Sequence, residues 1–316
     1  MIVIGALNTD IIASGVPEWP HPNGTVYGGR LIIGPGGKSR NIAAMAGVLS
    51  VPGTVAMIGR TAQDSYGLWK SPVDALKAAG VNINHVKILK PEETDKFPAV
   101  ALLAVNEHGD NQCYVLPGVS DDFSESDIDE AHGIFESTAQ NQGIFALTLE
   151  CPTKTAKHAI DKANGLGIRI VLDPGGVVAG QDMSSLLKAK PFLLKPNEHE
   201  ARIMTGIEVT DFESARQAAD KLRGLGASNV LLTHGEHGAY LFTDQGSAHV
   251  PIPDITAGEV KDVTGCGDQA MAALCAYLQA GKTLEEAARV AVLAGTLQFY
   301  KSGIQPITKQ ELEARL

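Results

Sequence analysis

A glycine-rich loop, Asp262–Asp268, is the segment of the sequence with the clearest capacity for chemistry. Its glycines allow the backbone N–H groups of Gly265, Cys266 and Gly267 to point at one spot. An amphipathic helix is predicted to start there, and its N-terminus would add about half a positive charge. Asp268, in the first turn, could cap the helix or act as a general base toward a hydroxyl group. The loop therefore predicts an anion site beside a carboxylate, with both roles of Asp268 open.

A second glycine cluster, Gly34 to Asn41, also opens onto a predicted helix. Its Gly-Lys-Ser run resembles a P-loop, but the GxxxxGKS pattern would require glycine at the position of Ile32. What remains is a turn that places Lys38 and Asn41 beside the end of a strand. Such a turn could bind a polyhydroxy ligand, or it could serve only as a tight connection.

Two further groups of polar residues follow predicted strands. Asn197 and Glu200 have the spacing of a helix capping box, which is by itself a structural feature. Asn8 and Asp10 alternate along the end of the first predicted strand, so their side chains should share a face and be either solvated or in contact with a ligand. The cysteines and histidines show no spacing typical of a metal site.

The elements that must position these residues read as an α/β fold. Val230 to Leu232 form a continuous apolar run, as expected of a parallel strand covered on both faces. We predict a central, mostly parallel sheet flanked by helices. The predicted strands cover 2–6, 54–58, 143–149, 168–173, 192–194 and 229–233, and the clearest helices cover 39–49, 212–222 and the stretch from 267 to about 280.

Two segments, 14–33 and 97–119, interrupt this alternation. The first is rich in proline and glycine, and the second reads as extended chain around a turn at 108–111. We expect both to form a small β lid inserted into a single domain, 1–316. An exposed β face of that size would need covering, so a homodimer through the lids is expected.

Composition excludes several classes of function. The formal net charge of −10 argues against a surface for nucleic acid, and no apolar run reaches the roughly 18 residues of a membrane span. Four widely spaced cysteines suit a reducing compartment, and the N-terminus reads as a strand instead of a signal peptide. We expect a cytoplasmic protein without nucleic-acid or membrane partners.

Taken in order, these motifs resemble the ribokinase-like carbohydrate kinases, the PfkB family, and are closest in pattern to its ribokinases. Asn8-Thr-Asp10 resembles the family's sugar-binding pair. The run from Gly36 to Asn41, which includes Gly37 and Lys38, resembles its first signature, and 262–268 its second. The resemblance implies a ribokinase-like fold and transfer of the γ-phosphate of ATP to a hydroxymethyl group of a sugar, a pentose such as ribose.

The resemblance also implies a role for each site residue. Asp268 would deprotonate the hydroxyl, while the N–H groups of 265–267 hold the charge on the transferred phosphoryl. Glu150 would contact the sugar, and Glu200 would orient Mg²⁺ through water. Residues expected at the nucleotide are Asn197, Thr233, Gly235, Gly238, Gly265 and Gly267. Asp262, Thr264 and carbonyls near Gly303 would hold a monovalent cation, potassium.

Four positions depart from the family pattern. Cys266 replaces the common alanine, Gln269 follows Asp268 where a small hydroxyl residue is frequent, and Ile307 stands where ribokinases have a serine of the cation site. Arg40 replaces a small residue, so it could bring a positive charge to the sugar pocket and alter the choice of substrate.

Two other functions remain open on the same scaffold. A nucleoside kinase would need aromatic side chains to stack on a base, and aromatics make up only 5% of the chain. A non-catalytic sugar or nucleotide sensor would not need the loop at 262–268. A dinucleotide-dependent oxidoreductase is disfavoured because no GxGxxG follows the first strand.

Overall fold

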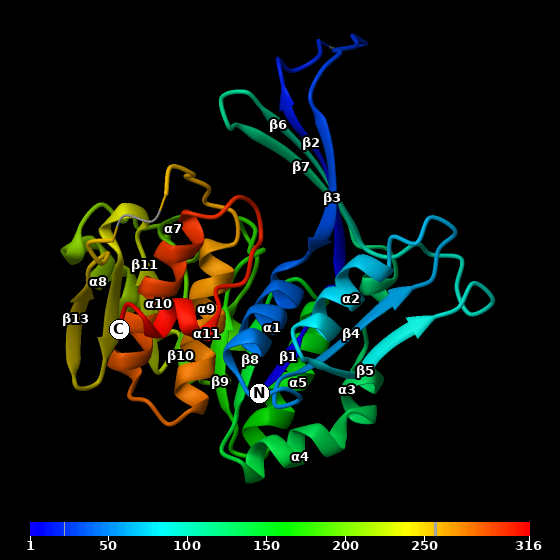
Figure 1. Ribbon diagram of the computed structural model, residues 1–316. Helices are drawn as coiled ribbons and strands as arrows, with labels where there is room; N and C mark the ends of the chain where they lie inside the picture. The colour runs from blue at the N-terminus through cyan, green and yellow to red at the C-terminus, as the bar shows by residue number, and fades with distance from the viewer. Residues whose placement is uncertain (22, 256–257) are drawn as a thin grey trace.

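The computed structural model describes residues 1–21, 23–255 and 258–316. Its main element is a nine-stranded sheet of order β13-β12-β11-β10-β9-β8-β1-β4-β5 (Figure 1). Neighbouring strands pair parallel from β11 through β10, β9, β8, β1 and β4 to β5, whereas β12 pairs antiparallel with both β11 and β13. The strands are β1 Ile2–Ile4, β4 Ala56–Ala62, β5 Asn82–Leu89, β8 Ile144–Thr148, β9 Arg169–Asp173, β10 Leu193–Leu194, β11 Asn229–Thr233, β12 Ala239–Thr243 and β13 Gly246–Val250. The predicted α/β fold is confirmed.

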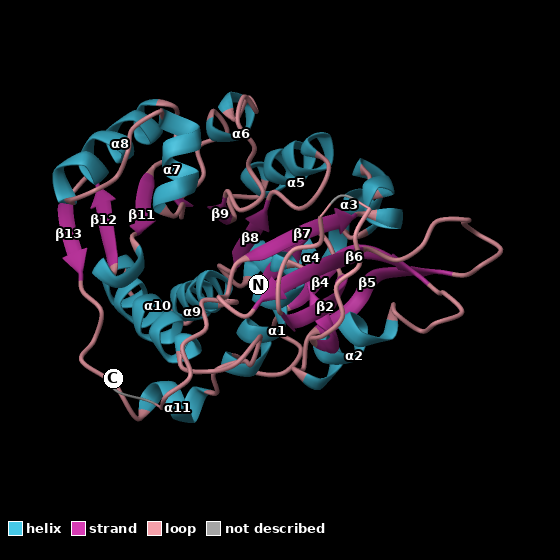
Figure 2. Cartoon of the chain, turned by 90° about the horizontal axis from the view of Figure 1, so that it is seen from above, coloured by secondary structure: helices cyan, strands magenta, loops and turns pink. Residues whose placement is uncertain are grey.

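Helices cover both faces of this sheet (Figure 2). Val3 of β1 packs into a cluster with α1, α9 and α10, while Ile2 and Ile4 pack on the other face against α4, α5 and α8. Because both faces are buried at the centre of the sheet, strands such as β1 and β10 are apolar throughout. The helices are α1 Lys38–Leu49, α2 Lys70–Ala78, α3 Glu125–Glu130, α4 His132–Gln140, α5 Thr153–Gly165, α6 Ser184–Leu187, α7 Glu198–Thr205, α8 Phe212–Gly224, α9 Cys266–Gln279, α10 Leu284–Phe299 and α11 Lys309–Glu313.

A second sheet of four strands projects away from the main one (Figure 1). Its order is β3-β2-β6-β7, and its strands are β2 Asn8–Val16, β3 Arg30–Gly36, β6 Val100–Asn106 and β7 Asn111–Leu116. We call it the small sheet. It includes parts of both segments that interrupt the α/β alternation, but it starts earlier, at Asn8. Residue 22, within the expected lid segment 14–33, lies outside the described residues.

The position of Asn8 and Asp10 differs from the prediction. They do not end the first strand of the main sheet but begin β2 of the small sheet. The chain leaves the main sheet at Gly5, whose φ of 136° favours glycine and where a Cβ would lie 2.2 Å from the Ser39 hydroxyl oxygen. Their alternation holds on β2, so the two side chains still share a face.

The parallel strands bring the sequence motifs to one edge. The chain continues from the carboxyl end of β1 to Asn8 and from that of β8 to Glu150, while α1 and α9 pack side by side with their N-termini near that edge. Ligands of open α/β sheets bind at this edge, where the strand order reverses. In this sheet the order reverses at β1, between β8 and β4.

Candidate active site

Two helix N-termini meet at Asp268. This residue lies in the first turn of α9 and is 6% exposed. The side-chain amide of Asn41, on α1, donates to its Oδ2 at 2.7 Å, and Nζ of Lys38 lies 3.7 Å from its Oδ1. The N-cap of α9 is Gly265, not Asp268. Asp268 is therefore held toward α1 and does not cap α9.

The loop before Asp268 has the conformation of an anion site at a helix start. Gly265 adopts a left-handed backbone with φ of 76°, which allows the sharp turn into α9. The N–H of Cys266 donates weakly to the Val263 carbonyl at 3.3 Å, so it is partly engaged within the loop. Burial raises the pKa of the Cys266 thiol to about 12. Cys266 is therefore a neutral thiol and contributes its backbone, not a nucleophile.

Two carboxyl groups line the space beside Asp268. The backbone N–H of Lys38 donates to Oε2 of Glu150 at 2.7 Å. Burial raises the pKa of Glu150 to about 7, with Asp268 adding to the effect and Lys38 opposing it. Burial likewise raises the pKa of Asp10 to about 6, against the charge of Arg40. Both groups change charge close to neutral pH, which is unusual for carboxyls.

Amide oxygens in the same place lack partners. Oδ1 of Asn8 and Oδ1 of Asn41 are buried and accept no hydrogen bond from the described residues. Gly37 makes room for this arrangement, because a Cβ there would lie 3.2 Å from the Asn8 nitrogen. Buried acceptors are almost always satisfied, so these two are suited to receive the hydroxyl protons of a ligand.

Arg40, expected to bring a positive charge to the sugar pocket, is buried beside the end of β3. It is 2% exposed and donates from Nε to the Gly36 carbonyl at 3.2 Å and from Nη2 to the Pro35 carbonyl. Its guanidinium thus fastens the end of β3 to α1 and acts on Asp10 through space. Arg40 and Lys38 put two cations at the positive end of a helix, which is unfavourable unless nearby carboxylates compensate.

Of the residues expected at the nucleotide, Gly265 and Gly267 lie at the start of α9, and the other four lie at or after the ends of β10 and β11. Asn197 and Glu200 form the predicted capping box of α7, with bonds of 2.8 and 3.0 Å, and Asn197 also bridges Thr233. In the turn after β11, a Cβ on Gly238 would lie 2.2 Å from a backbone carbonyl. Gly235, which begins the short helical turn after β11, also has a positive φ, of 44°.

Glu200 fits a role at a magnesium ion. Only its Oε2 is used in the capping box, which leaves Oε1 as a hard oxygen donor for Mg²⁺ or a water bound to it. Burial and the charge of Asp173 raise its pKa. A nearby divalent cation would favour its ionised form.

Sequence analysis missed a buried ion pair beneath the loop. Nζ of Lys195 donates to Oδ2 of Asp173 at 2.8 Å, and both residues are 3% exposed. The same Nζ lies 3.9 Å from where a Cβ on Gly267 would stand. Asp173 ends β9 and Lys195 follows β10, its parallel neighbour. Polar residues directly after adjacent strands were the signal that could have identified the pair.

The residues expected to hold a monovalent cation have protein partners instead. Oδ1 of Asp262 accepts from the N–H of Thr264 and Oδ2 from that of Gly303, both at 2.8 Å. The carbonyls of Thr264 and Gly303 accept from Nε2 of Gln298, a residue that sequence analysis did not single out. This donor set does not fit a cation, because an amide nitrogen already lies between the two carbonyls.

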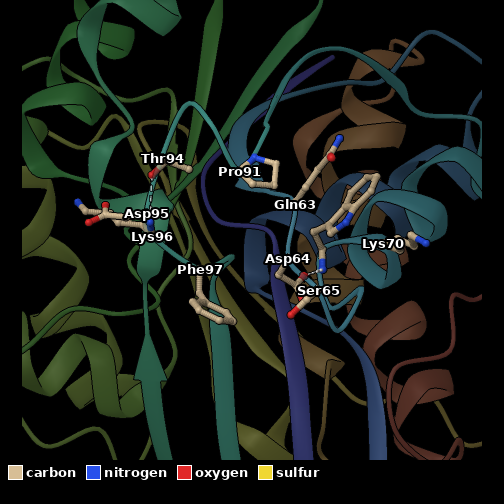
Figure 3. A pocket seen from close by; sticks show the side chains of 10 residues that line it. Gln63, Asp64, Ser65, Lys70, Pro91, Thr94, Asp95, Lys96 and Phe97 are labelled. Atoms are coloured by element: carbon tan, nitrogen blue, oxygen red, sulfur yellow. Dashed lines mark hydrogen bonds between the residues drawn. The ribbon is translucent and has the colours of Figure 1, made fainter.

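A separate cavity of about 570 Å³ opens on the other side of β2 (Figure 3). Its walls come from the chain after β4, including Gln63 and Trp69, and from the chain before β6, including Pro91 and Phe97. Thr9, whose side chain points away from that of Asp10, donates to the Leu68 carbonyl at this wall. None of the site residues lines this cavity.

Among the described residues, no helix is long and apolar enough to span a membrane.

Comparisons with known proteins find similar sequences and structures along nearly the whole chain. The family model described as "pfkB family carbohydrate kinase" matches residues 1–310. A deoxyribokinase of Salmonella typhi is 29% identical over 96% of this chain and 93% of its own length. A ribokinase of Haemophilus influenzae is 28% identical over 99% and 97%. The solved structure of Arabidopsis thaliana ribokinase complexed with ribose and ATP superimposes with a TM-score of 0.86 at 26% identity, over 99% of this chain and 97% of that one.

Proposed function

The chain belongs to the pfkB family of carbohydrate kinases, and we propose that it transfers the γ-phosphate of ATP to a hydroxymethyl group of a pentose such as ribose or deoxyribose. One observation carries this proposal. Asp268 lies beside the glycine loop at the start of α9, held by Asn41 at 2.7 Å. A carboxylate and an anion site are thus adjacent, as phosphoryl transfer to an alcohol requires. Ribokinases and a deoxyribokinase among the relatives support a pentose.

In this reaction Asp268 accepts the proton of the hydroxymethyl group. The resulting alkoxide forms a bond to the γ-phosphorus, the bond from that phosphorus to the bridging oxygen breaks, and ADP leaves. The N–H groups of Gly265 and Gly267, with the helix N-terminus behind them, stabilise the charge on the transferred phosphoryl. Asp268 raises the pKa of the Lys38 ammonium, so Lys38 stays protonated and adds positive charge there.

Glu200 would hold Mg²⁺ through water, and the ion would supply charge neutralisation on the phosphates. Asn197 and the turn carrying Thr233, Gly235 and Gly238 would contact the nucleotide. The buried Lys195 pairs with Asp173 and lies near Gly267. These groups position ATP with its γ-phosphate toward Asp268, and positioning is the main source of rate in this class of reaction.

Sugar recognition falls to groups that accept hydrogen bonds. Asp10 and Glu150 provide carboxylate oxygens, and Asn8 and Asn41 provide the two amide oxygens that lack partners. A small polyol with several hydroxyl donors satisfies all of them at once, whereas an apolar ligand would leave them buried and unpaired, at high cost.

The small sheet would act as a lid and as a dimer interface on opposite faces. Asp10 lies on one face. Ile33, Ile11, Leu102 and Tyr114 form a row across the other, where Ile33 is 53% and Tyr114 68% exposed. Exposed apolar rows of this kind mark interaction sites, and a second copy of the same sheet is their natural complement. A homodimer results, which light scattering can test.

Use of ATP and four cysteines without disulfide partners support a cytoplasmic location.

A panel of sugars and nucleosides, assayed for ATP-dependent ADP release with Asp268→Asn as the blank, tests the function. A pentose with the highest kcat/KM is expected. A nucleoside as the best acceptor would instead make the chain a nucleoside kinase. Tight binding of a sugar with no phosphorylated product would make it a sensor.

A further inference from the structure

The groups that the family resemblance assigns to a monovalent cation have hydrogen-bond partners within the chain. Asp262 accepts two backbone hydrogen bonds, one on each carboxylate oxygen. Both oxygens of the Asp262 carboxylate are therefore engaged by backbone N–H groups of the chain.

The carbonyl oxygens of the site converge on an amide. Nε2 of Gln298 donates to the Gly303 carbonyl at 2.6 Å and to the Thr264 carbonyl at 3.3 Å. An NH₂ group has two donors, which matches two acceptors. Oε1 of Gln298 accepts no hydrogen bond from the described residues, and the reverse orientation of the amide would place it against the two carbonyl oxygens, so the nitrogen is assigned to face them. Gln298 is fully buried in the last turn of α10.

Ile307, four residues after Gly303, also has its partners within the chain. Ile307 stands where ribokinases have a hydroxyl, is fully buried, and packs into an apolar cluster with Ala273 and Leu297. Its N–H donates to Oε1 of Gln269 at 3.0 Å. Two glutamine amides thus tie the segment 303–307 to α9 and α10, and no hydroxyl oxygen is offered at this position.

We propose that the side-chain amide of Gln298 takes the place of the monovalent cation, so that phosphoryl transfer by this chain needs no potassium. The amide and a cation between the same two carbonyls exclude each other. Gln298 is thereby a positioning residue, because the carbonyl of Thr264 precedes Gly265 and its hydrogen bond fixes the loop that presents the N–H groups. This role rests on the proposed kinase function, whereas the replacement of the cation rests on the geometry alone.

The test compares the parent protein with Gln298→Ala in KCl and in tetramethylammonium chloride at equal ionic strength. The parent should show the same kcat/KM and the same Tm in both salts. Gln298→Ala removes the donor and leaves two carbonyls around a gap. Its kcat/KM should fall about tenfold in tetramethylammonium, as expected for two lost buried hydrogen bonds, and KCl should restore it. KCl should also raise the Tm of this variant, because an ion that binds only the folded state stabilises it.

Gln305→Ala is the matched control. Its amide is exposed and donates to the Ser302 carbonyl at 2.7 Å in the same segment, so potassium should change neither its rate nor its Tm. Activation or stabilisation of the parent by potassium would overturn the proposal, and this arm needs no variant. A folded Gln298→Ala that potassium neither rescues nor stabilises would also overturn it. The Tm measurements need no substrate, so they remain decisive even if the panel finds no acceptor and the kinase proposal fails.

Discussion

The raised pKa values of Glu150 and Asp10 should make kcat/KM fall steeply as the pH is lowered. Glu150→Gln should remove most of that fall. Burial raises the pKa of Glu150 to about 7 and that of Asp10 to about 6. A raised pKa means that the protonated form persists to higher pH. Hydrogen-bond acceptors for the sugar are therefore lost as the pH falls, first through about 7 and then through about 6.

These two values set the size of the effect. If both groups must be ionised, the competent fraction falls about twentyfold between pH 8 and pH 6. With Gln at position 150 only Asp10 still titrates, and the fall shrinks to about twofold. The glutamine keeps a carbonyl oxygen for the Lys38 N–H, so the local structure should persist. At pH 8 the variant should bind the sugar more weakly, since a neutral acceptor replaces a charged one.

The assay is kcat/KM for the best acceptor as a function of pH, because this ratio reports ionisations of the free protein. Glu313→Gln, an exposed change on α11, serves as the control and should follow the parent. A twentyfold fall that survives in Glu150→Gln would show that the acid limb arises elsewhere. A flat profile in the parent would refute the reasoning outright.

Three further changes test other parts of the account. Arg40→Met should raise the pKa of Asp10, measured by carboxyl NMR, whereas Arg40→Lys should largely preserve it; equal midpoints in parent and Arg40→Met would rule out the electrostatic role. Lys195→Met should lower the free energy of unfolding in urea by about 3 to 5 kcal/mol, since Asp173 is left buried and unpaired. Adding Asp173→Leu should recover part of that loss, and no recovery would mean that the pair is not the cause. Ile33→Lys should give a monomeric mass in light scattering, and an unchanged dimer would place the interface elsewhere.

Motifs with a local signature were predictable from the sequence. The glycine loop before Asp268 and the capping box at Asn197 each combine residue types at fixed spacing, and both stand at helix starts as expected. Parallel strands were recognisable because they are apolar on both faces. Proximity of Asn41 to Asp268, far apart in the chain, followed only from the family resemblance.

Features that depend on tertiary placement could not be predicted from the sequence. The break at Gly5 moved Asn8 and Asp10 onto another sheet, and a single glycine does not distinguish a strand end from a bulge. The hydrogen bonds from Arg40 to the backbone of β3 likewise depend on the fold. Gln298 is one polar residue in a largely apolar helix, and its function depends on two carbonyls that the fold brings to it.

The central claim is that Asp268 transfers a proton at the anion site, and one variant tests it directly. Asp268→Asn keeps the size of the side chain and an oxygen for the Asn41 amide, but it cannot act as a base. Its kcat with the best sugar should fall about 10²-fold to 10⁴-fold, while the Kd for the sugar, measured by calorimetry, stays close to that of the parent. Turnover near the parent rate would contradict the account.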